Sequence, residues 1–191
     1  MSARLPAALT PVQDAAALLA RAAGEESTVG GVCIRGADLS GTRYDGLRLR
    51  GVRLEGCRLT GCRWERADLA DVVLEDCELS GSGWRDAAWR DCRLPDAVFD
   101  RARLRRVAVS GCDLTGASLC DCQWKGWTLA ETSLRSVRLL HTPLAGLDLT
   151  GCELDGVAVS DTHAELRGAV VTMEQAAMLA KRLGLVIKGG G

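Results

Sequence analysis

The stretch from residue 37 to residue 61 reads ADLSG-TRYDG-LRLRG-VRLEG-CRLTG, five consecutive units of five residues that each end in glycine. The third residue of every unit is large and apolar, and charged residues fall mostly at the second and fourth positions. A period of five fits neither the 3.6-residue period of a helix nor the two-residue period of an ordinary strand. Each unit therefore predicts a very short extended piece followed by a turn, and glycine suits that turn.

The same spacing continues in both directions without interruption. Stepping by five from Ile34 to Val159 meets 26 consecutive apolar residues, which we call the centres of the repeats. The residue two before each centre has a small or modest side chain, with Trp127 as the conspicuous large exception. A centre and this smaller residue should point the same way, because alternate residues of an extended chain share a face. One unit cannot bury its own centre, but stacked coils can bury the centres of one another.

Units such as 37-ADLSG-41 and 67-ADLAD-71 resemble the A-(D/N)-L-x-x signature of the pentapeptide-repeat family, and the resemblance covers about residues 32–161. It implies an all-β solenoid, a right-handed quadrilateral β-helix with four repeats in each coil and about 6.5 coils in all. Four aromatic residues support a 20-residue coil independently, because Tyr44, Trp64 and Trp84 are 20 residues apart and Trp124 follows 40 residues later. We expect inward core columns, not a platform for stacking bases, at Tyr44, Trp64, Trp84, Trp124 and Leu114.

The N-terminal flank predicts a short helix that covers one open end of the solenoid. The motif 10-TPVQ-13 supplies a capping Thr, a Pro at the first helical position and a Gln at the third. The helix should run to about Ala23 and stop at Gly24.

The C-terminal flank repeats this capping signal at 172-TMEQ-175, and the helix should end near Gly184, before a short strand-like segment at 185–187. We favour a cap over the core. The alternative is a homodimer contact, as in the dimerising element of the gyrase-protecting branch of the family that this flank resembles. The candidate contact residues are Met178, Leu179, Leu183, Leu185 and Val186. The expected domains are a capping extension at 1–30, the β-helix at 31–168, and the helix and strand at 169–191.

Nine cysteines could indicate a metal or redox site. Seven of them occupy the inward position two before a centre, where Cys acts as a compact apolar residue. Cys33 and Cys120 fall on predicted surface positions, so we expect them to be the accessible thiols. Neither His141 nor His163 has a nucleophile or ligand set beside it, and no phosphate loop or zinc-ligand spacing is present. We predict no enzyme activity, no metal and no cofactor.

Composition indicates one soluble domain without a strong overall charge. The 191 residues carry a formal net charge of −1, and no apolar run reaches the length that spans a bilayer. The first residues lack a secretory signal, so we expect a cytoplasmic protein.

The charges are nevertheless distributed unevenly, because a 20-residue coil places every fourth repeat on the same face. The face that carries the aromatic column has eight cationic and three acidic side chains, a net charge of +5, while the other three faces carry −2, −3 and −2. We call it the basic face. Its cationic residues are Arg43, Arg63, Arg66, Arg85, Arg103, Arg105, Arg106 and Lys125.

Two functions are compatible with these features. The first is a non-enzymatic scaffold whose rod surface binds a protein partner, with the basic face docking an acidic protein or, less favoured, nucleic acid. The second is implied by the resemblance: a DNA mimic that modulates or protects DNA gyrase or topoisomerase IV and gives quinolone or toxin resistance. We favour the first, because the acidic faces are weak and no loop interrupts the repeats.

Overall fold

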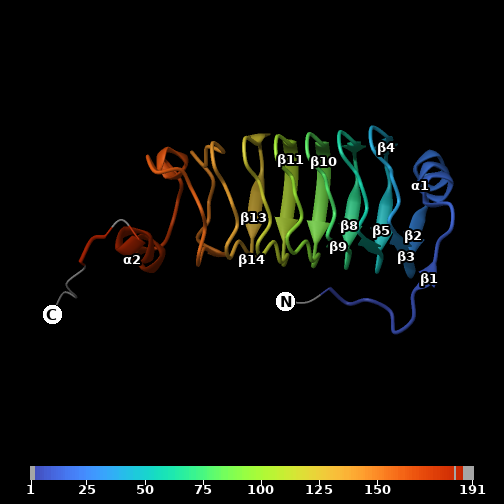
Figure 1. Ribbon diagram of the computed structural model, residues 1–191, viewed down its shortest axis with the longest axis horizontal. Helices are drawn as coiled ribbons and strands as arrows, with labels where there is room; N and C mark the ends of the chain where they lie inside the picture. The colour runs from blue at the N-terminus through green and yellow to red at the C-terminus, as the bar shows by residue number, and fades with distance from the viewer. Residues whose placement is uncertain (1–2, 183, 187–191) are drawn as a thin grey trace.

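The computed structural model describes residues 3–182 and 184–186. These residues form a right-handed quadrilateral β-solenoid of about seven turns with a short helix at each end. Figure 1 shows the turns stacked side by side along the long axis, with α1 at one end and α2 at the other. This is the fold that the five-residue period and the family resemblance predict.

The strands are short, since each covers one side of a coil. They are β1 (Thr10–Pro11), β2 (Thr28–Gly30), β3 (Val32–Arg35), β4 (Arg43–Asp45), β5 (Arg48–Arg50), β6 (Arg53–Glu55), β7 (Arg63–Glu65), β8 (Asp68–Ala70), β9 (Val73–Glu75), β10 (Gly83–Arg90), β11 (Arg103–Ser110), β12 (Gln123–Lys125), β13 (Thr128–Ala130), β14 (Thr132–Ser133) and β15 (Cys152–Glu153). The helices are α1 (Ala15–Gly24), the 3-10 helix η1 (Ala164–Leu166) and α2 (Met173–Arg182).

Parallel pairing with a 20-residue offset joins each coil to the next. Tyr44 pairs with Trp64, Trp64 with Trp84, and Trp84 with Leu104. Backbone hydrogen bonds run between coils throughout, as from the Leu114 amide to the Ser133 carbonyl at 3.0 Å. The register confirms the coil length that the spacing of the aromatic residues predicts.

The corners of the coils use the left-handed backbone region, as expected from the glycines. Gly41 and Gly61 have φ of +69° and +67°. Where the glycine is replaced, the corner residue keeps a positive φ, as Arg66 does at +51° and Asp86 at +53°. Such residues bear some backbone strain, which is smaller for Asp and Asn than for most side chains.

The core is the filled interior of the solenoid. Leu114 is fully buried and Tyr44, Trp64 and Trp84 are at most 2% exposed. The rings of Trp64 and Trp84 stack with centroids 4.7 Å apart and planes 3° apart.

Trp124 departs from the expected inward column, because it is only partly buried. Its Nε1 donates a hydrogen bond to the Pro143 carbonyl at 2.5 Å. Trp127, which replaces the small residue usual at its position, is buried in the same coil, with its ring centroid 6.3 Å from that of Trp124. Trp127 thus fills interior space in this coil, and Trp124 lies at the margin of the core.

The N-terminal helix begins later than the TPVQ motif predicts. Asp14 caps α1, its carboxylate accepting from the Ala17 amide at 2.9 Å. Thr10–Pro11 instead form β1, which pairs in parallel with β3. The edge of the first coil explains this difference, because its free backbone groups need partners and the segment before the helix supplies them. Leu19 of α1 is fully buried against the core, so the helix covers this end.

At the other end the 20-residue register stretches to 22, since Asp148 pairs with Val170. Thr172 and Gln175 cap α2 as predicted, each accepting from the backbone amide of the other at 3.2 and 2.7 Å. The Gln175 side chain also donates to the Leu149 and Cys152 carbonyls, both at 2.8 Å, and so fixes α2 to the last coils. The predicted strand at 185–187 is absent from its described part, 185–186.

None of the helices within residues 3–182 and 184–186 is long and apolar enough to cross a membrane.

Candidate functional site: the basic face of the solenoid

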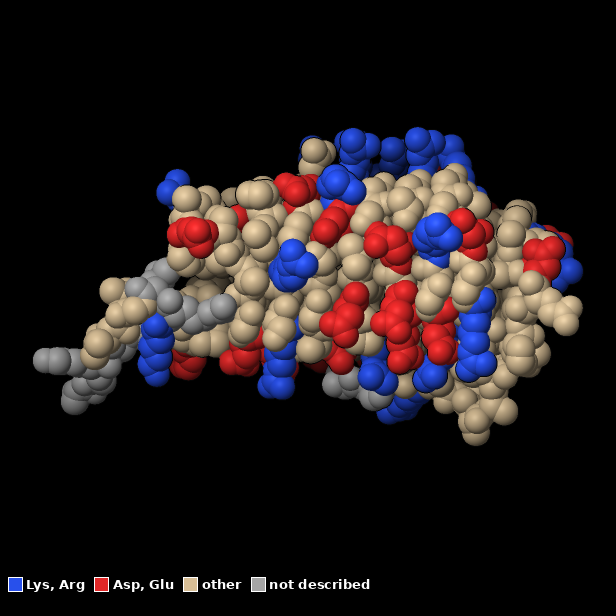
Figure 2. Space-filling model, in the orientation of Figure 1, with Lys and Arg blue, Asp and Glu red and all other residues tan. Residues whose placement is uncertain are grey.

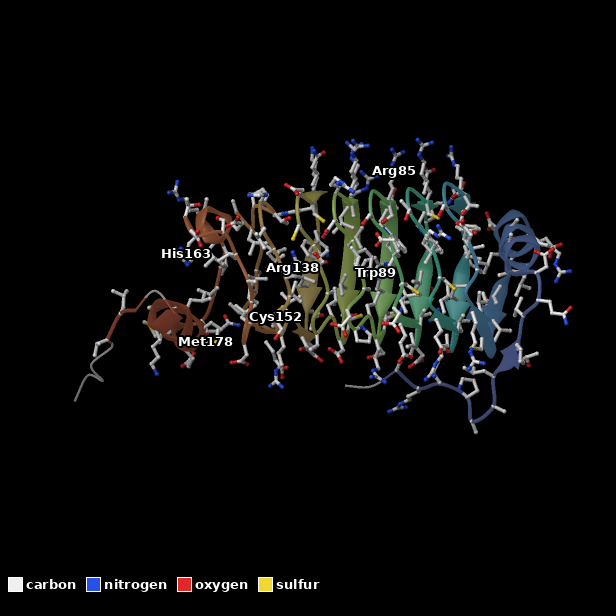
Figure 3. All side chains as sticks on the ribbon, in the orientation of Figure 1. Arg85, Trp89, Arg138, Cys152, His163 and Met178 are labelled. Carbon is white, nitrogen blue, oxygen red and sulfur yellow. The ribbon has the colours of Figure 1, made fainter. Side chains whose placement is uncertain are left out.

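The basic face runs along one edge of the rod. Its residues come from β4, β7, β10, β11 and β12 and the corners that follow them, stacked in register. Figure 2 shows a row of Lys and Arg side chains along the upper edge, and Arg85 is labelled there in Figure 3. The solenoid thus brings together cationic residues that lie up to 82 positions apart, from Arg43 to Lys125.

Three acidic side chains on this face form ion pairs with some of the arginines. Glu65 contacts Arg43 at 2.9 Å and Arg85 at 3.8 Å. In the same way Asp45 pairs with Arg66 at 2.9 Å and Asp86 with Arg106 at 2.8 Å. The hydrogen bonds from Arg106 lower the pKa of the Asp86 carboxyl below its ordinary value. Exposed pairs of this kind contribute little to stability.

Four cationic side chains of the basic face remain without an acidic partner. Within the part of the chain that the structure describes, Arg63, Arg103, Arg105 and Lys125 make no ion pair, and all four are exposed. The charge of these four side chains is therefore not neutralised by other described residues. The strands that carry them are fixed in place by backbone hydrogen bonds between coils.

A hollow of about 240 Å³ lies within the basic face. Its lining is Arg63, Trp64, Glu65, Gly83, Trp84, Arg85, Arg103 and Arg105. Reasoning from the sequence missed Gly83. The sequence does carry a signal for it: Gly83 stands one residue before a centre, where a strand begins and no turn requires a glycine.

All nine cysteines are buried, and none forms a disulfide. The prediction that Cys33 and Cys120 are accessible thiols is wrong: they are 7% and 8% exposed. β1 pairs alongside Cys33, and Cys120 lies against the Ser118 hydroxyl at 3.4 Å. Burial also raises the pKa of Cys122 to about 12 and of Cys152 to about 11, so these thiols stay protonated.

The two histidines lie apart. His141 Nδ1 is 3.1 Å from the Asp121 carboxylate on the exposed surface. His163 lines a hollow of about 190 Å³ between the last coil and α2, with Leu166 and Leu179 among its neighbours. No group of three or more His, Cys, Asp or Glu side chains that could hold a metal occurs among the residues described.

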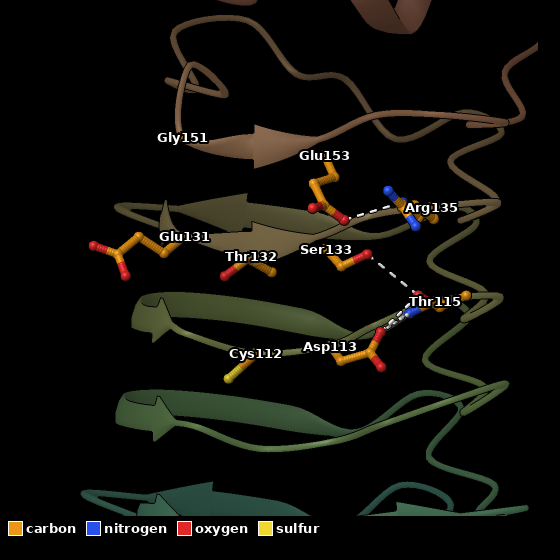
Figure 4. Close-up of a pocket in the computed structure, with 9 residues that line it drawn as sticks. All are labelled: Cys112, Asp113, Thr115, Glu131, Thr132, Ser133, Arg135, Gly151 and Glu153. Atoms are coloured by element: carbon orange, nitrogen blue, oxygen red, sulfur yellow. Dashed lines mark hydrogen bonds and ion pairs between the residues drawn. The ribbon is translucent and has the colours of Figure 1, made fainter. Parts of the chain in front are cut away.

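A second polar hollow, of about 380 Å³, is shown in Figure 4. Its lining is Cys112, Asp113, Thr115, Glu131, Thr132, Ser133, Arg135, Gly151 and Glu153. Asp113 accepts from the Thr115 hydroxyl at 2.6 Å, and Arg135 pairs with Glu153 at 3.0 Å. Two of its four charged side chains, Arg135 and Glu153, are thus paired with each other, and Asp113 is engaged with a hydroxyl group.

The candidate dimer residues lie in two environments. Met178 and Leu179 are half-buried in α2, and Met178 packs against the core. Leu185 and Val186 are 58% and 90% exposed. Leu183 lies outside the described residues.

The family model described as pentapeptide repeats matches residues 48–82 and 85–121 of the chain, with eight copies of the repeat. A search of curated protein sequences finds no match.

Solved structures similar to the chain include full-length QnrB1, a plasmid-mediated fluoroquinolone resistance protein, at 20% identity and a TM-score of 0.48, covering 84% of this chain and 91% of that one. HetL, a pentapeptide repeat protein involved in heterocyst differentiation regulation from the cyanobacterium Nostoc sp. strain PCC 7120, is 19% identical with a TM-score of 0.26, covering 75% and 89%. Rfr23, from the cyanobacterium Cyanothece 51142, is 14% identical with a TM-score of 0.23, covering 77% and 89%.

Proposed function

The chain belongs to the pentapeptide-repeat family, and from this premise we propose that it is a non-enzymatic scaffold whose basic face binds a protein partner. Proteins of this family typically act as scaffolds for protein interactions. The partner would present an acidic surface to Arg63, Arg103, Arg105 and Lys125.

The observation that supports this proposal is the row of cationic side chains without acidic partners. Facing cations one coil apart, such as Arg105 and Lys125, repel each other and do not help the fold. A complementary acidic surface would relieve that repulsion and would raise the rate of association. The core behind the row is filled and the coils are joined by backbone hydrogen bonds, so little would have to be ordered on binding.

A protein partner fits the basic face better than nucleic acid does. The five stacked strands of the face span about 20 Å at about 4.8 Å for each coil. Proteins that hold duplex DNA through its backbone neutralise several phosphates, often about 6–10. Four unpaired cations on a chain of net charge −1 fall short of that number. An acidic protein surface needs to match the charge of the basic face only where the two surfaces touch.

A charge-reversal experiment tests the proposal. The full chain is immobilised, and partners retained from cell extract are identified and then titrated in purified form. The variant R103E/R105E should bind the partner at least about tenfold more weakly. The matched control R138E/R167E makes the same change of charge at exposed arginines outside the basic face and should bind as the wild type does. Equal binding by both variants would contradict the proposal.

A more specific alternative function is that of a DNA mimic, which modulates or protects DNA gyrase or topoisomerase IV and gives quinolone or toxin resistance. The net negative charge of the other three faces supports it. Ion pairs weaken that support, because acids on those faces are often matched by arginines. Glu55 pairs with Arg35 at 2.9 Å, and Asp68 pairs with Arg50 at 2.8 Å. A supercoiling assay with purified gyrase, with and without a fluoroquinolone, tests the alternative, and no effect at micromolar protein would exclude it.

A further inference from the structure

Gly83 interrupts a column of arginines on the basic face. The strand register places Arg63 on one side of Gly83 and Arg103 on the other, in the column just before the aromatic centres. The hollow of about 240 Å³ forms where the side chain of residue 83 would otherwise lie. The missing side chain therefore opens a gap that is bordered by cations.

Four guanidinium groups and one carboxylate line this hollow. Arg63 and Arg103 lie two coils apart, about 10 Å, which their long side chains can span toward a common ligand. Arg85 and Arg105 line it from the column on the other side of the aromatic centres. The carboxylate is Glu65, which pairs with Arg43 as well as with Arg85.

Neither packing nor backbone conformation explains the glycine at position 83. A Cβ atom built there meets nothing within 4 Å, and its φ lies outside the left-handed region. Glycine within a strand also lowers stability by roughly 0.5–1 kcal/mol relative to Ala. The glycine therefore lowers the stability of the strand, and the facing cations beside it, Arg85 and Arg105, repel each other.

We propose that the hollow over Gly83 binds a phosphate group through Arg63, Arg85, Arg103 and Arg105. Three of these arginines have no acidic partner within the described residues, so a single carboxylate would neutralise only part of their charge. A phosphate monoester carries about −1.5 to −2 at neutral pH and offers three acceptor oxygens. Guanidinium groups bind such oxygens in pairs of parallel hydrogen bonds.

The phosphate is either a free anion or a phosphorylated side chain of a docked protein. In the second case the site rests on the proposed function, because the partner then carries the phosphate to the basic face. The two sources share the same contacts and are separated by the choice of probe.

The variant Gly83→Val tests the site without removing any charge. Valine suits a strand and has room here, so the fold should be kept and the melting temperature unchanged or higher. Calorimetry with the full chain uses three probes: inorganic phosphate, a phosphoserine peptide and the same peptide without phosphate. Gly83→Val should weaken binding of the phosphorylated probes at least about tenfold, because the side chain fills the hollow. The control Arg138→Ala removes an exposed charge outside the basic face and should change binding by less than about twofold.

Binding of both phosphate and phosphopeptide to the wild type identifies a free anion as sufficient, and binding of the phosphopeptide alone identifies a phosphorylated partner. Equal binding of the phosphopeptide by wild type and Gly83→Val, or no binding by either, would overturn the site. The proposed function could still stand, since it is judged by R103E/R105E. Lys125→Ala removes a charge of the basic face outside the hollow. If it weakened binding of duplex DNA as much as Gly83→Val does, the proposed site would also be overturned, because phosphates would then be attracted along the whole face. If the valine variant did not fold, Arg63→Gln combined with Arg103→Gln would replace it.

Discussion

Trp64 and Trp84 stack in the same column of the core, yet their indole N–H groups differ. Trp84 donates to the Ser82 hydroxyl at 2.9 Å, whereas Trp64 Nε1 is buried and has no partner among the described residues. The residue two before each indole explains the difference, because Cys62 stands where the next coil has Ser82. A buried donor without an acceptor costs about 1–3 kcal/mol.

We predict that Cys62→Ser raises the free energy of unfolding by about 1 kcal/mol, because the hydroxyl should accept from Trp64 as Ser82 accepts from Trp84. Urea unfolding followed by circular dichroism measures the change. Cys122→Ser is the matched control, since it lies in the same column and precedes Trp124, whose N–H already bonds to Pro143. The control should be neutral or destabilising. An equal gain in both variants would mean that the unsatisfied indole is not the cause.

The element that closes the C-terminal end of the solenoid depends on one buried carboxylate. Glu165 in η1 is 3% exposed and accepts from the His141 amide at 2.8 Å and from the Ser160 hydroxyl at 2.8 Å. Its own carbonyl accepts from the Leu144 amide at 2.8 Å. Burial alone raises the pKa of Glu165, but the hydrogen bonds from His141 and Ser160 outweigh it, so the pKa lies below the ordinary value.

A carboxyl whose pKa is lowered by folding stabilises the fold above its unfolded pKa and loses that contribution as the pH falls through the folded pKa. We therefore expect Glu165→Gln to reduce the free energy of unfolding by about 2 kcal/mol at pH 7. The difference from wild type should shrink as the pH falls below the ordinary pKa of a Glu side chain, about 4.3, and through the lowered pKa of the folded state, where Glu165 takes up a proton. Denaturant unfolding at several pH values measures this. Glu131→Gln, at an exposed acid, serves as the control and should change little at any pH.

At the scale of the whole molecule, the two ends of the rod are closed differently. α1 buries Ala15, Leu19 and Ala22 against the first coil. No residue of α2 with a described side chain is fully buried, and Met173, Leu185 and Val186 at this end are exposed apolar residues. The C-terminal end therefore offers apolar surface that a second copy of the chain could cover.

These exposed apolar residues favour the alternative to a simple cap, so we predict a homodimer through this end. Light scattering of the full chain should give the mass of two chains, and L185E/V186E should give the mass of one chain without loss of stability, because both residues are exposed. A wild-type mass of one chain would exclude the dimer. The control is Thr162→Glu, which adds a charge at an exposed residue of the last coil, and this variant should stay dimeric. Leu18→Glu would not serve as a control, because Leu18 packs against the core.

The sequence by itself determined the solenoid and most of its inward residues, because every repeat restates the period of five. The 20-residue coil, and with it the basic face, came from the family resemblance and from the spacing of four aromatic residues. Only the tertiary structure decided which cations lack partners, that Gly83 opens a hollow among arginines, and that Trp124 lies at the margin of the core while Trp127 is buried. It also decided that β1 pairs alongside Cys33. These features depend on the side chains of neighbouring coils, or on how an end segment folds back onto the first coil. A repeat period specifies where a side chain points, but the volume and charge it meets there are set by residues about 20 positions away.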